Sequence, residues 1–247
     1  MSEPQEDSFI SHLVELRDRL LRAVVAVVVV FVCLMPWAGD IYDILAHPMM
    51  SALPEGTKMI ATGVVTPFFV PMKVTLLVAF VIALPFVLYQ AWCFIAPGLY
   101  AHEKRLGLPL VVGSTVLFLA GMAFCYFFVF GTVFKFIAQF APKSITPAPD
   151  IEQYLAFVMS MFLAFGITFE VPVIVIVLVK LGIVDVAKLK EARPYVIVGA
   201  FVIAAVVTPP DVVSQLMLAV PMCLLYELGI FLSRFVTKTR ADEAVSS

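Results

Sequence analysis

The chain has 247 residues, of which 62% are hydrophobic and 14% are charged, with a formal net charge of −2 and a mean hydropathy of +1.06. A surface in contact with water needs far more charge, so this balance excludes a soluble globular domain. The composition predicts a polytopic membrane protein with little mass outside the bilayer.

Residues 1–22 are predicted to form an amphipathic helical segment at the inner face of the membrane. Glu15 precedes Arg19 by four residues and Asp18 precedes Arg22 by the same distance, the spacing of stabilising acid–base pairs on a helix. The opposite, apolar face of this segment carries Leu13, Leu16, Leu20 and Leu21.

Six apolar windows follow, and each predicts a membrane-spanning helix. The strands of a β-barrel would alternate polar and apolar residues, whereas these windows are apolar on every side. We therefore expect an all-α, single six-helix membrane domain over residues 1–234 and a polar, disordered tail over 235–247. The windows are residues 23–39, 74–102, 106–134, 153–179 with Glu170 inside it, 194–210 and 212–226.

The basic residues are distributed unevenly between the segments that connect these windows. With the N-terminus inside, 12 of the 16 lysines and arginines fall on inner segments, and the positive-inside rule then predicts that both termini are cytoplasmic. The four outer basic residues are Lys58, Lys73, Lys135 and Lys143.

The fifth and sixth windows are short for membrane spans. At 1.5 Å per residue they reach about 26 and 23 Å, below the ~30 Å hydrocarbon core. Two explanations remain open at this point. The bilayer is thinned around these helices, or Glu227 and Arg234 extend to the interface and the sixth span is longer than its charge-free window.

Glu170 is the one formal charge deep inside a predicted span. A carboxylate at that depth costs at least about 2–3 kcal/mol on insertion scales, which favours a functional site. The structural alternative is a buried carboxyl bonded to Gln215 or Thr208. Pro172 should kink the helix beside it. Asp211, after two prolines at a tight outer turn, is interpreted as the N-cap of the sixth span.

Glu15 and Glu103 lie on the same predicted face of the membrane, in the first and second inner segments. Each alone would be an ordinary solvated acid. Together they could receive a pair of guanidinium groups, which bind carboxylates through two parallel hydrogen bonds in a way that lysine cannot.

Motifs of catalytic or cofactor-binding proteins do not occur in the sequence. A phosphate-binding loop, HExxH and GxSxG are missing, which argues against ATP hydrolysis and intramembrane proteolysis. The three histidines lie at 12, 47 and 102, where no two could hold a haem inside the bilayer, and the four cysteines lack metal-ligand spacing. We expect neither an enzyme nor a cofactor.

Five ordered motifs resemble those of the TatC family, the receptor subunits of the bacterial twin-arginine translocase. The resemblance covers nearly the whole chain up to about Arg234. The motifs are residues 12–20 (HLVELRDRL), 89–100 (YQAWCFIAPGLY), 165–172 (FGITFEVP), 192–195 (ARPY) and 208–211 (TPPD).

The resemblance implies a cupped six-helix bundle in the bacterial inner membrane that receives twin-arginine signal peptides of folded proteins, with passage driven by the proton motive force. It also implies self-association and docking of the single-span subunits TatA and TatB on the fifth and sixth spans, and no nucleic-acid partner. The implied signal-peptide site comprises Glu15, Arg17, Phe94, Leu99, Tyr100 and Glu103. The implied intramembrane polar site comprises Glu170, Gln215 and Thr208, and Pro48, Tyr126 and Asp211 are assigned to assembly and transport.

Two other classes of function stay open on the sequence. A proton- or ion-coupled carrier of small solutes would use Glu170 as its coupling site, although no inverted repeat is recognisable. A purely structural scaffold would tolerate changes at Glu15 and Glu103.

Overall fold

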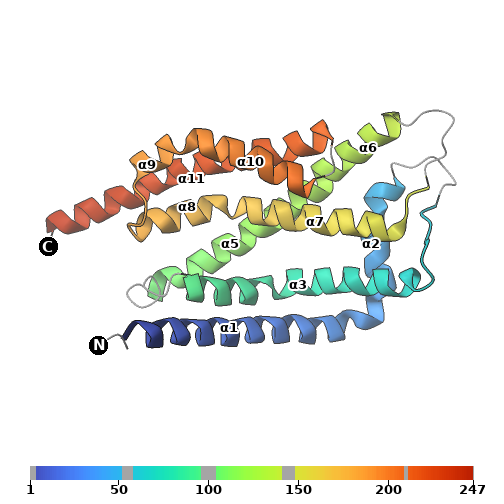
Figure 1. Cartoon of the computed structure of the whole chain (residues 1–247), viewed down its shortest axis with the longest axis horizontal. Helices are drawn as coiled ribbons and strands as arrows, with labels where there is room; N and C mark the ends of the chain where they lie inside the picture. The colour runs from blue at the N-terminus through green and yellow to red at the C-terminus, as the bar shows by residue number, and fades with distance from the viewer. Residues whose placement is uncertain (1–3, 52–57, 96–103, 141–147, 209–210, 247) are drawn as a thin grey trace. The chain divides into compact units, whose positions relative to one another are not determined.

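The computed structural model describes residues 4–51, 58–95, 104–140, 148–208 and 211–246, and these are almost entirely helical (Figure 1). The one β-type pairing in the described part is an isolated bridge between Ile60 and Asp150. The helices are α1 (Pro4–Leu34), η1 (Met35–Trp37), α2 (Ala38–Met50), α3 (Thr66–Ile95), α5 (Lys104–Phe124), η2 (Cys125–Val129), α6 (Phe130–Phe140), α7 (Ile151–Phe169), α8 (Val171–Lys180), α9 (Val186–Glu191), α10 (Arg193–Val207) and α11 (Val212–Ser246).

Five helical segments of the described chain are long and apolar enough to cross a membrane, and α10 is a shorter apolar helix of 15 residues. The predicted all-α class with six apolar helices is confirmed, and so is the short fifth span. The five long segments are Ser11–Met50, Thr66–Ile95, Gly107–Ile137, Ile151–Lys180 and Val212–Arg234.

The sixth span is longer than its charge-free window, so the second of the two explanations left open by the sequence is confirmed for this helix. Its apolar segment Val212–Arg234 has 23 residues, which corresponds to about 35 Å of helix. Glu227 does not end the span because its carboxylate accepts a 2.7 Å bond from Arg193 and stays half exposed. The helix then continues to Ser246, through the tail for which the sequence predicts disorder.

The N-terminal amphipathic segment is not a separate short helix. It is the first part of α1, which runs without interruption for 31 residues into the first span. No proline or glycine lies between Gln5 and Met35, so nothing in this stretch breaks the helix.

The chain divides into two compact units. The first consists of Met1–Tyr42 and Pro71–Thr115. Within it, α1 and α3 lie side by side (Figure 1). The buried Trp92 indole N–H donates to the Ser114 hydroxyl at 2.8 Å and ties α3 to α5.

The second unit consists of Asp43–Val70 and Val116–Ser247, and its helices pack closely. Helix α11 lies against α8 and α10. The α8–α11 contact is centred on Val175, Val179 and Ile230. Small residues permit these close approaches, as is usual between helices in lipid: a methyl group at Gly229 would stand 3.0 Å from the Pro172 Cα atom.

Candidate functional site

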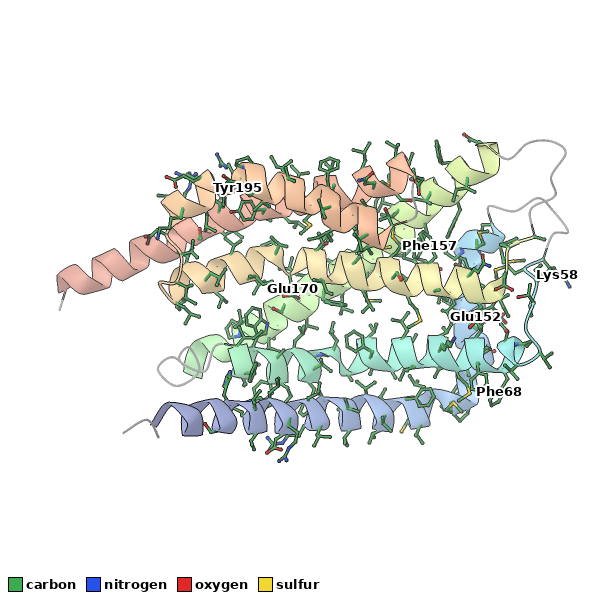
Figure 2. All side chains as sticks on the ribbon, in the orientation of Figure 1. Lys58, Phe68, Glu152, Phe157, Glu170 and Tyr195 are labelled. Atoms are coloured by element: carbon green, nitrogen blue, oxygen red, sulfur yellow. The ribbon has the colours of Figure 1, made fainter. Side chains whose placement is uncertain are left out.

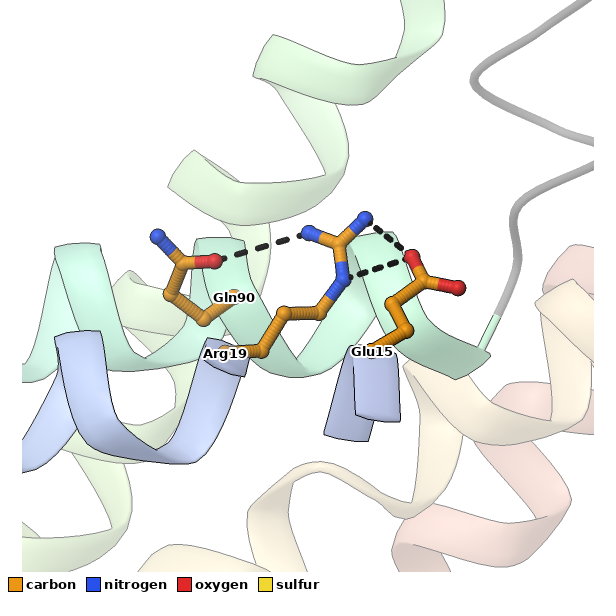
Figure 3. Close-up of polar contacts among 3 residues, drawn as sticks. All are labelled: Glu15, Arg19 and Gln90. Atoms are coloured by element: carbon orange, nitrogen blue, oxygen red, sulfur yellow. Dashed lines mark hydrogen bonds and ion pairs between the residues drawn. The ribbon is translucent and has the colours of Figure 1, made fainter. Parts of the chain in front are cut away.

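Glu15 lies on α1, where Arg19 holds its carboxylate one helical turn away. The Arg19 Nε and Nη2 atoms both donate to Glu15 Oε1, at 2.9 and 2.6 Å (Figure 3). The Glu15 side chain is 42% exposed. The pair predicted from the four-residue spacing is therefore present, and the carboxylate remains open to a ligand.

Arg19 also connects the two helices of the site. Its Nη1 atom donates to Gln90 Oε1 of α3 at 3.5 Å, and Gln90 is only 5% exposed (Figure 3). The guanidinium group thus lies between an accessible carboxylate and a buried amide. The role of Gln90 could not be predicted from the sequence, because it depends on how α3 packs against α1.

An apolar groove adjoins the ion pair between α1 and α3. The rings of His12 and Phe94 stack beside it, with centroids 4.4 Å apart and planes inclined by 17°. The groove has a volume of about 200 Å³. It is lined by Leu16, Arg19, Leu20, Ala23, Val87, Gln90, Ala91, Phe94 and Ile95.

The predicted signal-peptide residues are only partly within the described chain. Glu15 and Phe94 both belong to this region of α1 and α3. Arg17 is exposed and its guanidinium group pairs with Asp18 at 2.8 and 3.0 Å. The remaining three predicted residues, Leu99, Tyr100 and Glu103, lie outside the described residues.

Glu170 occupies the single-residue junction between α7 and α8 (Figure 2). Pro172 supplies no N–H to the helical ladder, and the Glu170 N–H bonds the Ile167 and Thr168 carbonyls at the end of α7. The helix is therefore interrupted at Glu170, beside the proline for which the sequence predicts a kink. The Glu170 residue is only 7% exposed, so the carboxyl group is held within the protein.

Thr208 caps the end of α10, and Gln215 connects α11 to α10. The Thr208 hydroxyl donates to the Ala204 carbonyl at 2.8 Å, and the Gln215 amide donates to the Phe201 carbonyl at 3.3 Å. Asp211 accepts a 2.7 Å bond from the Ser214 N–H through Oδ1. The interpretation of Asp211 as a helix N-cap is therefore confirmed.

Pro48 and Tyr126 are linked by the Ile44 backbone carbonyl, which Pro48 cannot bond and which Tyr126 does bond. Proline has no N–H, so Pro48 cannot bond the Ile44 carbonyl four residues earlier in α2. The Tyr126 hydroxyl, on the π-helical turn η2, donates to that carbonyl at 3.1 Å. Tyr154 of α7 bonds the neighbouring Leu45 carbonyl at 2.8 Å. Two tyrosines thus secure the end of α2 that carries the proline.

Comparison with known proteins gives the family. The model of the family described as "Sec-independent protein translocase protein (TatC)" matches residues 11–221 of this chain. This chain belongs to the TatC family. The TatC proteins of Haemophilus influenzae and Escherichia coli K12 are 51% and 50% identical to it, over 98% and 95% of this chain and 95% and 91% of their own lengths.

A solved structure agrees with this assignment. The crystal structure described as "Twin Arginine Translocase Receptor- TatC" superposes with a TM-score of 0.80 at 40% identity, covering 92% of this chain and 99% of that one. Membership of the TatC family makes the chain a multi-pass membrane component of a protein translocase and not an enzyme. The alternative of a small-solute carrier is not supported.

Proposed function

We propose that this chain is the twin-arginine signal peptide receptor and assembly core of a Tat translocase, which exports folded proteins across the bacterial cytoplasmic membrane on the proton motive force. The observation that carries this proposal is the half-exposed carboxylate of Glu15 in a chain of the TatC family. The solved TatC relative, described as a twin-arginine translocase receptor, supports it.

Recognition would begin at Glu15. A peptide guanidinium can form two parallel charge-assisted hydrogen bonds with a carboxylate, whereas a lysine ammonium offers a single point of charge. In this proposal Glu103 supplies the second acid, and Arg17, Leu99 and Tyr100 complete the patch around it. The groove beside Phe94 would accept apolar atoms of the same peptide.

Both termini are proposed to be cytoplasmic, so the Glu15 region would face the compartment in which precursors are made. The concentration of basic residues on the predicted inner segments supports this orientation. The apolar part of the signal peptide would then enter the bilayer toward Glu170, with Thr208 and Gln215 contributing to the intramembrane polar site.

The partners are proposed to be TatA, TatB and further copies of this chain. Helices α10 and α11 are the proposed docking surface for the two single-span subunits. Large apolar side chains on one side of α10 are exposed, among them the labelled Tyr195 (Figure 2). The others are Val198, Val202 and Val206.

The direct test is the affinity of the purified chain, reconstituted in nanodiscs, for a fluorescent twin-arginine peptide. Replacing Glu15 or Glu103 by Gln should weaken binding at least about tenfold, because each removes a charge-assisted bond. Glu191→Gln, which changes an exposed acid on α9, is the matched control and should leave the affinity unchanged. Unchanged binding in both site variants would refute the proposed recognition.

A further inference from the structure

The Glu15 carboxylate already carries a guanidinium group in the structure, and that group belongs to the chain itself. Arg19 offers Nε and Nη2, two adjacent donors of its planar fork, to one carboxylate oxygen. An arginine of a signal peptide would use the same kind of donor on the same carboxylate. The resident and the incoming groups are therefore chemical equivalents.

Arg19 has a second acceptor within reach. Its Nη1 atom lies 3.5 Å from Gln90 Oε1, and the buried Gln90 side chain is fixed on a different helix. Arg19 also lines the apolar groove between α1 and α3. The guanidinium group could leave Glu15 and still keep Gln90 as a hydrogen-bond acceptor. Its displacement would therefore not leave the whole group without a hydrogen-bond partner.

The resident pair is also weak enough to exchange. Acid–base pairs at this spacing on exposed helix surfaces contribute little to stability, because water and salt screen them. A peptide arginine can replace both bonds that Arg19 gives up. A peptide lysine has no planar fork and replaces them poorly.

We propose that Arg19 is an internal competitor, a resident guanidinium that occupies Glu15 in the empty receptor and, when a signal peptide binds, leaves Glu15 while it keeps its bond to Gln90. This inference rests on the proposed receptor function. Displacing Arg19 costs any cationic ligand the same free energy, so the exchange lowers the affinity of every such peptide by one factor. Arg19 thus sets the affinity of the site, and the choice between arginine and lysine lies with the bonds that the peptide itself makes to Glu15.

The experiment compares twin-arginine and twin-lysine peptides on the full chain in nanodiscs. In Arg19→Gln the affinity for twin-arginine peptide should rise about twofold, the value of the lost pair. The affinity for twin-lysine peptide should rise by the same factor, so that the ratio of the two dissociation constants stays constant. Arg19→Lys, which keeps the charge but lacks the fork, should raise both affinities by less than Arg19→Gln does.

Arg22→Gln is the control for charge alone, since it removes one exposed cation from the next turn of the same helix. It should raise both affinities less than Arg19→Gln does, because Glu15 accepts its bonds from Arg19. If Arg19→Gln raised the affinities no more than Arg22→Gln, or weakened twin-arginine binding, Arg19 would be no competitor and the inference would be overturned. Equal binding of the two peptides by the wild-type chain would instead overturn the receptor function itself, and this inference with it.

Discussion

The first span and the fourth are equally apolar but are packed very differently. The most apolar 18-residue windows of Ser11–Met50 and Ile151–Lys180 have mean hydropathies of 2.5 and 2.6. None of the first window is buried within the described part of the protein, against 56% of the second. In lipid the apolar character of a helix determines that it inserts, and close packing determines what it contacts.

The packing difference follows from small residues. Helix α7 contains Gly166, and a methyl group there would come within 2.4 Å of the Phe118 ring. The apolar part of α1 is a run of valines with no glycine. The two helices therefore differ in their setting: α7 is closely packed and continues to the buried Glu170, whereas α1 carries the half-exposed Glu15 at a loosely packed position.

The largest expected effect concerns the close approach of α5 to α7. A methyl group at Gly121 would stand 2.5 Å from the Phe165 carbonyl oxygen, which is backbone and cannot rotate away. Gly121→Ala should therefore cost about 1–3 kcal/mol of unfolding free energy, measured by reversible unfolding in mixed micelles. Gly113→Ala on the same helix, with nothing within 4 Å, is the control and should be neutral or slightly stabilising. Equal losses of unfolding free energy in Gly121→Ala and Gly113→Ala would contradict the close packing of α5 against α7 at Gly121.

An intermediate effect is expected where Pro48 and Tyr126 share the Ile44 carbonyl. Tyr126→Phe should cost about 1 kcal/mol, because that carbonyl loses its hydroxyl partner. In a Pro48→Ala background the loss should shrink, since residue 48 then offers its own N–H. A double-mutant cycle on unfolding free energies measures this coupling.

Tyr154→Phe is the matched control for this cycle. The Leu45 carbonyl has a helical donor at Met49 whether or not residue 48 is proline. Coupling of Pro48→Ala to Tyr154→Phe should therefore be weaker than its coupling to Tyr126→Phe. If the effects of Pro48→Ala and Tyr126→Phe on the unfolding free energy were additive, the two residues would not be coupled through the Ile44 carbonyl.

The smallest effect is a pH dependence at the start of α7. Asp150 accepts bonds from the Thr62 hydroxyl and from the N–H groups of Gln153, Thr62 and Glu152, and these hold the pKa of its carboxyl below the ordinary 3.8. Its contribution to stability is complete above that ordinary value and is lost as the pH falls through the lowered one.

Thermal unfolding measured from about pH 5 to pH 2 checks this dependence. Asp150→Asn keeps an acceptor for the helix end but does not titrate, so its melting temperature should fall less steeply with acid than that of the wild type. Parallel curves for the two proteins would rule out a contribution from this carboxyl.

The features that could be predicted from the sequence are those set by local spacing. Apolar length gave the spans, the four-residue spacing gave the Glu15–Arg19 pair, and the turn chemistry identified Asp211 as a cap. Contacts between distant segments could not be predicted in this way. Gln90 joins the site only because α3 packs beside α1, and Tyr126 reaches the Ile44 carbonyl across 82 positions of sequence.

The length of the sixth span shows a second limit. Its charge-free window ends before Glu227, but the charge is compensated by Arg193, which lies 34 residues away in sequence. A rule that counts uncharged residues along the chain cannot include a partner on another helix. The sixth span therefore extends past Glu227 because a tertiary ion pair compensates that charge.

The most direct test of the receptor function is site-specific photocrosslinking in membranes, with probes placed beside Glu15 and Glu103. We predict crosslinks to a precursor that carries twin arginines, none to the same precursor with twin lysines, and loss of the crosslinks when both acids are replaced by Gln. Equal crosslinking of the two precursors, or crosslinks that survive removal of the acids, would contradict recognition of the signal peptide at this site.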